Sequence, residues 1–187
     1  MDQNIRILGI AGSLRKGSYN LAALRAAQGL LPDGVSLAIF ELDGIPLFNE
    51  DEEKAPPPKV IEFKKQIREA DALLFATPEY NYSIPGVLKN AIDWASRPYG
   101  DSAWTGKAGA IMGASVGSIA TARAQYHLRQ VCVFLNIYLL NQPEVMIGNA
   151  SKRFDSSGNL TDEATIDHIR KMLVSLTEWT RRLRSKA

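Results

Sequence analysis

The feature of this sequence that most constrains its fold is a regular alternation of short apolar runs with segments of helical periodicity. Five apolar runs have the length of buried strands: Ile5–Ala11, Val35–Phe40, Ala72–Thr77, Ala108–Gly113 and Ile137–Leu140, the last with an extension towards Met146. Each run is followed by a segment whose apolar side chains repeat every three or four positions. Strand–helix units that repeat in this way predict an α/β fold in which a parallel sheet is covered by helices on both faces.

Capping and breaking residues predict where the helices begin and end. Ser18 stands in an N-cap position, and the first helix is expected to include Leu30 and Leu31 before Pro32-Asp33-Gly34 ends it. The later helices are expected to begin near Pro58, at Ser83-Ile84-Pro85, near Ile119 and at Thr161. No linker, repeat or low-complexity segment interrupts the pattern, so residues 1–187 are expected to form a single domain.

Composition excludes several classes of function. With 22 Lys+Arg against 20 Asp+Glu, the net charge is +2, which argues against a nucleic-acid binder that acts by neutralising phosphates. A single cysteine, Cys132, excludes an intrachain disulfide, and with only His127 and His168 it cannot form a usual zinc site. Cys132 is expected to lie in the core. We see no signal peptide and no run long enough to span a membrane, which predicts a cytoplasmic protein without a membrane partner.

Functional groups are expected in the loops after the first, third and fourth strands, because ligands of such sheets bind beyond the carboxyl ends of the strands. The first loop, Gly12–Asn20, leads into a helix N-terminus, which attracts anions. Ser13, Ser18 and Asn20 can donate hydrogen bonds there, and Arg15 adds a guanidinium group that can donate two hydrogen bonds to one anion. Together they suit a phosphate monoester bound without a metal.

The glycine spacing of this loop decides among the phosphate-binding motifs. The ATP-binding P-loop fails because Ser18, not lysine, follows Gly17. The dinucleotide fingerprint fails because Ala11 and Leu14 stand where its second and third glycines should be. A mononucleotide phosphate fits best, which in a five-stranded sheet points to FMN. The alternative is a capped turn that binds no ligand.

The loop after the third strand, Thr77–Gly86, has the composition of a wall for a flat ring. Tyr80 and Tyr82 can face such a ring, and the prolines lower the entropy lost when a loop orders on binding. The alternative is a surface loop whose tyrosines pack locally.

With both loops considered, the sequence is similar to the NADPH-dependent FMN reductase family, and within it most similar to the bacterial chromate and quinone reductases. The matching segments are Gly12–Asn20, Thr77–Trp94, Ala122–Leu135 and Asn141–Glu144. The resemblance implies a flavodoxin-like fold with strand order 2-1-3-4-5, non-covalent FMN, and NADPH or NADH as co-substrate. It also implies a homodimer or homotetramer with the flavin near the subunit interface.

The resemblance also assigns roles to individual residues, and it assigns no catalytic side chain, because FMN carries the chemistry. The phosphate would be held by Ser13, Arg15, Ser18 and Asn20, with Leu21 beside them; the ring would contact Pro78, Glu79, Tyr80, Asn81 and Tyr82; and Ser115 and Gly117 would approach its other side. Tyr126 and Glu144 match a subunit-contact network. Ala120-Thr121 replaces the glycine pair of the family, which leaves contacts beyond Gly117 unassigned.

The activity expected from the resemblance is ping-pong transfer of a hydride from NAD(P)H to FMN, and then reduction of a quinone, chromate, azo or flavin acceptor. Backbone N–H groups of residues 81–83 would stabilise the reduced ring, and Arg15 and Lys16 would favour the 2′-phosphate of NADPH. One alternative is a flavodoxin-type electron carrier, which the charge of +2 disfavours. Another is a serine esterase, because Gly113–Gly117 reads G-x-S-x-G around Ser115. Its triad would need Asp167 and His168, which are adjacent on a helix and point apart.

Overall fold

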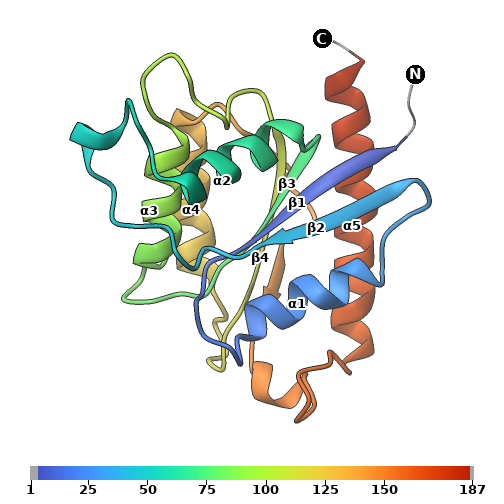
Figure 1. The fold of residues 1–187 in the computed structure, drawn as a ribbon. Helices are drawn as coiled ribbons and strands as arrows, with labels where there is room; N and C mark the ends of the chain where they lie inside the picture. The colour runs from blue at the N-terminus through green and yellow to red at the C-terminus, as the bar shows by residue number, and fades with distance from the viewer. Residues whose placement is uncertain (1–3, 186–187) are drawn as a thin grey trace.

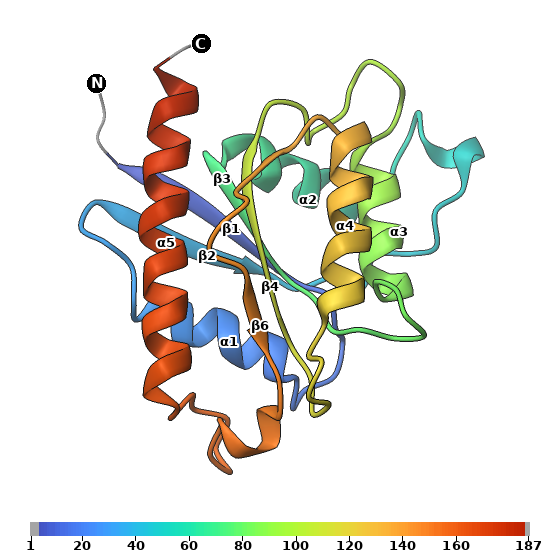
Figure 2. The same ribbon diagram turned by 180° about the vertical axis from the view of Figure 1, so that it is seen from behind.

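The computed structural model describes residues 4–185. These residues form a parallel sheet that is covered by helices on both faces (Figures 1 and 2). The strands are β1 (Ile5–Ala11), β2 (Val35–Phe40), β3 (Ala72–Ala76), β4 (Ala108–Ala114), β5 (Tyr138–Leu139) and β6 (Val145–Ile147). The helices are α1 (Tyr19–Gln28), α2 (Pro58–Glu69), α3 (Gly86–Ala95), α4 (Ala122–Phe134) and α5 (Glu163–Arg184), with short 3₁₀ turns at Glu50–Glu52 and Ala150–Lys152.

The strand order, β2-β1-β3-β4-β5, confirms the predicted topology, and every pairing is parallel. The predicted fifth strand is not continuous, however. β5 pairs with the start of β4 and β6 pairs with its end, so that Met112 lies beside Val145. Pro143, between the two pieces, has no N–H to donate to the sheet, and the chain leaves the sheet around it.

The two faces of the sheet are covered by different helices. α1 and α5 pack on one face, and α2, α3 and α4 pack on the other (Figures 1 and 2). Successive residues of the central strands alternate between these layers, so that Leu74 contacts the first and Phe75 the second. Because both faces are buried, the central strands are apolar throughout, which is why they stand out in the sequence.

Local geometry corrects two predicted helix ends. Ser18 does cap α1, accepting a hydrogen bond from the Leu21 N–H at 3.3 Å, but the predicted extension to Leu30 and Leu31 is wrong. The helix ends at Gln28, where Gly29 forms the C-cap, and the two leucines pack against the core from outside the helix. α4 begins at Ala122 rather than near Ile119, because Ala120 has a φ of +57° and cannot be helical.

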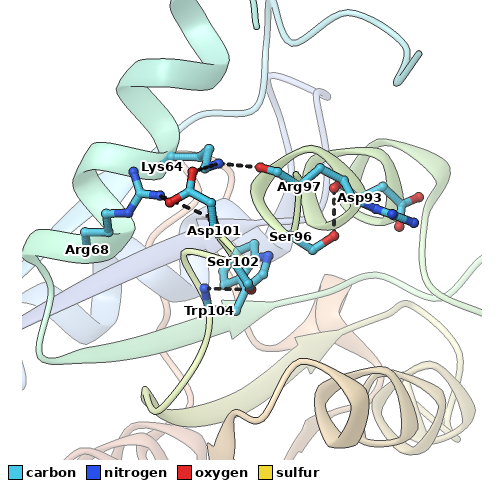
Figure 3. A network of polar contacts seen from close by, with 8 residues as sticks. All are labelled: Lys64, Arg68, Asp93, Ser96, Arg97, Asp101, Ser102 and Trp104. Carbon is cyan, nitrogen blue, oxygen red and sulfur yellow. Dashed lines mark hydrogen bonds and ion pairs between the residues drawn. The ribbon is translucent and has the colours of Figure 1, made fainter. Parts of the chain in front are cut away.

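A polar network fixes the loop between α3 and β4 onto α2 (Figure 3). The side chain of Lys64, 5% exposed, donates to the Arg97 carbonyl and to Asp101 Oδ2, the latter at 2.8 Å. Arg68 Nη2 lies 2.6 Å from the other Asp101 oxygen. The hydrogen bond from Lys64 lowers the pKa of Asp101 below its ordinary value. The network holds the helical layer that carries α3, and therefore the loop that precedes α3, in place on the sheet.

Candidate functional site

Three loops meet at the carboxyl ends of β1, β3 and β4 and line a pocket of about 210 Å³. Backbone hydrogen bonds continue beyond the strands, from the Gly12 N–H to the Ala76 carbonyl at 2.9 Å and from the Thr77 N–H to the Met112 carbonyl at 3.0 Å. A Cβ at Gly12 would lie 3.2 Å from Pro78 Cδ, so glycine allows the first and third loops to approach closely. The sequence prediction that these loops come together is therefore confirmed.

The first of these loops ends in a helix N-terminus with free donors. The N–H groups of Tyr19 and Asn20 make no hydrogen bond within residues 4–185, because they belong to the first turn of α1. Ser13 Oγ accepts from the Arg15 N–H at 3.2 Å, and Arg15 Nη2 donates to the Gly17 carbonyl at 2.7 Å. These contacts shape the loop into a concave turn whose open donors suit an anion.

Asn20 has a role that its sequence position does not indicate. Its side chain is 3% exposed and brackets Ala114 at the end of β4, donating to the carbonyl at 3.0 Å and accepting from the N–H at 2.8 Å. The side-chain amide is therefore engaged within the protein, and the backbone N–H is the group of Asn20 that remains open to a ligand. Leu21 likewise contributes its N–H to the Ser18 cap, while its side chain is buried in the core.

The loop after β3 forms a tight hairpin turn. Tyr80 and Ser83 exchange two backbone hydrogen bonds, of 3.1 and 2.9 Å, and Asn81 and Tyr82 between them have φ values of +49° and +68°. Two positive φ values are the pattern of a type I′ turn, which is unusual for a tyrosine. The N–H groups of Asn81 and Tyr82 have no acceptor in the described part of the chain, whereas the Ser83 N–H is already bonded.

Three residues of this loop, Glu79, Tyr82 and Ser83, contact α4. Glu79 is a nearly buried carboxylate that forms an ion pair with Arg123 and accepts from the Ala124 N–H at 3.1 Å. The Arg123 guanidinium lies 3.8 Å from the centre of the Tyr82 ring, and Ser83 Oγ lies 2.8 Å from His127 Nδ1. Sequence reasoning missed this clamp, because its partners are about 44 residues apart in the chain.

The loop after β4 completes the pocket with Ser115 and Val116. Ser115 Oγ accepts from the Gly117 N–H at 3.2 Å, which closes a short turn. Further along, Ala120 keeps a left-handed backbone conformation, and Thr121 packs on Gly113, where a Cβ would lie 2.0 Å from Thr121 Oγ1. The chain thus takes a glycine-like course at Ala120, where the family resemblance expects glycine.

Comparison with known proteins identifies the family to which the chain belongs. A profile of the family described as NADPH-dependent FMN reductase matches residues 5–152. The chain is 57% identical over 185 residues to an NAD(P)H-dependent FMN reductase from Pseudomonas aeruginosa, covering 98% of this chain and 100% of that one. The chain belongs to the NADPH-dependent FMN reductase family.

Two further relatives agree with this assignment. A 2-hydroxy-1,4-benzoquinone reductase from a Burkholderia species is 46% identical over 177 residues, which cover 95% of this chain and 97% of that protein. The structure of the flavoenzyme NAD(P)H:(acceptor) oxidoreductase from Paracoccus denitrificans superimposes with a TM-score of 0.88 at 33% identity, covering 95% and 98% of the two chains. The predicted flavodoxin-like fold, oxidoreductase class and dependence on FMN and NAD(P)H are confirmed at the level of the family.

The donors at the pocket fit the cofactor of this FMN reductase family. The open N–H groups of Tyr19 and Asn20 lie in the same pocket lining as Ser13 and Arg15, and donors of this kind suit a phosphate. Directly after the lining residue Tyr80, the N–H groups of Asn81 and Tyr82 have no acceptor among residues 4–185, and the side chains of Tyr80 and Tyr82 are exposed; such donors and rings are of the kind that suits a flavin. No group of His, Cys, Asp and Glu residues within positions 4–185 is arranged to hold a metal ion.

The esterase alternative finds no support in this FMN reductase chain. The Asp167 carboxylate lies 2.7 Å from Lys171 Nζ, which lowers the pKa of Asp167, and it does not orient a histidine. In the described structure, the side-chain oxygen of Ser115 is bonded to a backbone N–H and to no imidazole. Gly113, part of the G-x-S-x-G pattern, is needed for its close contact with Thr121.

Two remaining expectations concern Cys132 and the membrane. Cys132 is 1% exposed, as expected of a core residue, and burial raises the pKa of its thiol to about 12. Among the helices of residues 4–185, none has the length and apolar character required to cross a bilayer.

Proposed function

We propose that this protein is an NAD(P)H oxidoreductase that binds one FMN at the pocket formed by the three loops and reduces small acceptors, with quinones as the main class. The observation that carries the proposal is a set of four open backbone N–H groups from two loops: those of Tyr19 and Asn20, which line the pocket, and those of Asn81 and Tyr82, in the turn that directly follows the lining residue Tyr80. The quinone-reductase names of the relatives support the choice of acceptor. Chromate, azo dyes and free flavin are further acceptors to be compared with quinones in the kinetic experiment below.

Residues at the phosphate end would bind and orient the cofactor. Ser13, Arg15 and the N-terminus of α1 would hold the phosphate, because a helix N-terminus and a guanidinium both stabilise a dianion. Ser18 would act as the cap that keeps the open N–H groups of this turn in place. Asn20 would act through its backbone N–H, since its amide is engaged at Ala114.

Residues at the ring end would orient the flavin and tune its charge. Bound FMN supplies the two-electron chemistry between NAD(P)H and the acceptor. The N–H groups of Asn81 and Tyr82 would donate to the pyrimidine edge of the ring and stabilise the negative charge that reduction brings. Pro78 and Tyr80 would form one wall, and Ser115 and Gly117 would approach from the loop after β4. Glu79 would contribute through its backbone, because Arg123 and Ala124 engage its carboxylate.

We infer that the protein works as a homo-oligomer. The outer face of α4 exposes apolar side chains, with Tyr126 at 54%, Val133 at 80% and Phe134 at 77%, on the helix whose first turns clamp the loop after β3. Arg129 Nε, a buried donor, has no hydrogen-bond acceptor in the described chain, and Glu144 Oε1 lies 4.0 Å away. A second copy seated on this face would cover the apolar residues and bring the interface close to the flavin.

Anaerobic mixing of the FMN-loaded protein with NADPH tests the proposed activity. We expect the yellow flavin absorbance to bleach within the mixing time and to return when a quinone is added. A protein that binds FMN but stays yellow would be an electron carrier of the flavodoxin type. A protein that binds no FMN would overturn both functions. Steady-state kinetics with a quinone, chromate, an azo dye and free FMN then rank the acceptors.

A further inference from the structure

A second cavity lies beside the phosphate end of the flavin pocket. It has a volume of about 640 Å³, within the range of ligand-binding pockets, and runs along the outer face of α1 against the segment between β6 and α5. That segment passes close to the N-terminal end of α1 in both views of the fold (Figures 1 and 2). We call this cavity the α1 groove. Its residues Arg15, Ser18 and Tyr19 also line the flavin pocket, so the two cavities adjoin.

The α1 groove carries an excess of positive charge. Arg15, Lys16 and Arg25 line it, and Asp155 is its one carboxylate. The side chains of Lys16 and Arg25 take part in no ion pair or hydrogen bond among residues 4–185, and both residues are exposed. Both Asp155 oxygens are already engaged by its own loop: Oδ1 accepts from the Ser157 N–H at 2.9 Å and the Asn159 N–H at 2.8 Å, and Oδ2 accepts from Asn159 Nδ2 at 2.9 Å. Two free cations in a groove with one engaged carboxylate favour an anionic ligand.

Part of the floor of the α1 groove is apolar. Ala22 and Ala26 of α1 and the C-cap Gly29 form a strip of small residues beside Arg25, and Leu160 and Ile166 also line the groove. These alanines, Leu160 and Ile166 are half-buried, so that the groove retains apolar surface open to a ligand. Ser156 and Ser157 add hydroxyl groups along the loop. A strip of small apolar residues with cations beside it suits a planar base attached to a phosphate.

We propose that the α1 groove binds the adenosine 2′-phosphate end of NADPH, with Lys16 and Arg25 holding the 2′-phosphate. The inference rests on the proposed function, because it assumes that the nicotinamide end of the same molecule reaches the flavin ring. The base lies on the alanine face of α1, and the groove leads from there past Arg15 into the flavin pocket. Lys16 and Arg25 thus discriminate NADPH from NADH, which lacks the phosphate that they contact.

Titration of the FMN-saturated protein with adenosine 2′,5′-bisphosphate tests the site without turnover. We expect isothermal calorimetry to show binding to the parent protein, and about tenfold weaker binding to the double variant Lys16→Gln/Arg25→Gln, the loss typical of a removed charged contact. Adenosine 5′-monophosphate, which lacks the 2′-phosphate, should bind both proteins equally. The matched control is Arg181→Gln/Arg182→Gln, which removes the same charge from the exposed carboxyl end of α5.

Kinetics give a second readout. In Lys16→Gln/Arg25→Gln we expect KM for NADPH to rise about tenfold, while KM for NADH and kcat stay at the parent values. The proposal is overturned if groove and control variants bind the bisphosphate equally, or if the bisphosphate displaces FMN and therefore binds at the phosphate end of the flavin pocket. A failure to take up FMN would instead overturn the proposed function, and calorimetry on that FMN-free protein would still report on the groove.

Discussion

For single residues at this site, the position in the chain could be predicted from the sequence, whereas the side-chain contacts could not. Ser18 is a cap because of its immediate neighbours, so its role follows from the local pattern. Asn20, two residues later, looks the same in the sequence, yet its amide binds Ala114, 94 residues away. Glu79 is similar, since Arg123 engages a carboxylate that the family resemblance places against the flavin. Local patterns predict backbone roles well, whereas side-chain partners distant in sequence require the fold.

Ala120 provides a prediction about backbone strain. Its φ of +57° is unfavourable for any residue with a Cβ, so Ala120→Gly should relieve the conflict. Glycine also gains entropy in the unfolded chain, which offsets part of this effect. We expect the free energy of unfolding to rise by about 0.5–1 kcal/mol in urea denaturation. Ala124→Gly, inside α4, is the control and should be destabilising. A destabilising Ala120→Gly would show that the conformation is not strained.

Cys132 provides a prediction about alkaline pH. Its folded-state pKa of about 12 exceeds the ordinary value, so the folded protein keeps a proton that the unfolded chain loses above about pH 8.5. The stability that the thiol contributes is therefore complete below that pH and is lost as pH rises towards 12. We expect denaturation midpoints to fall more steeply from pH 8.5 to 10.5 in the parent than in Cys132→Ala. Identical slopes in the two proteins would contradict the assignment.

At the scale of elements, α4 supports the loop after β3, residues 77–86, which we call the flavin loop because we propose that it contacts the ring. Its first turns hold Glu79, Tyr82 and Ser83, and the two positive φ values in that loop are maintained by these contacts. Element existence and order were predictable, because five buried strands and their helices have strong periodicity. The interruption between β5 and β6 was not, since each piece is defined by pairing with a different end of β4.

The clamp between the flavin loop and α4 predicts a loss of cofactor affinity when it is weakened. Glu79→Gln removes the charge that Arg123 and the Ala124 N–H engage, so the loop should be less ordered in the free protein and lose more conformational entropy when FMN binds. We expect FMN to bind about three- to tenfold more weakly, measured by quenching of FMN fluorescence. Arg123→Met should have a similar effect, and the double variant should add little to it. Glu69→Gln, at an exposed position of α2, is the matched control; an equal loss there would refute the clamp.

At the scale of the whole molecule, the sheet places all three loops at one edge and the apolar face of α4 beside them. The strand order could be inferred from the family resemblance, and the position of the pocket followed from the general rule for such sheets. The α1 groove was not predictable, because it forms between α1 and a segment about 130 residues later whose contacts no local pattern reports.

The exposed face of α4 predicts an assembly larger than one chain of 20.6 kDa. We expect light scattering after size exclusion to give a multiple of this mass for the parent protein, and the single-chain mass for Val133→Glu/Phe134→Glu, because buried carboxylates at an interface are strongly unfavourable. Leu47→Glu, at a loop residue 85% exposed, should leave the mass unchanged. A parent protein that elutes at 20.6 kDa would refute the inference.

The bond between Asn20 and Ala114 has a consequence for ligand choice. It joins the first turn of α1 to the end of β4, so the open donors of that turn and the loop that carries Ser115 cannot move apart independently. We therefore expect the proposed flavin site to hold a phosphate at a fixed distance from the loop after β4, and to bind flavins with a shorter or longer linker more weakly than FMN. Lumiflavin, which has no phosphate, would leave the open N–H groups of Tyr19 and Asn20 without an acceptor, whereas FMN would engage them.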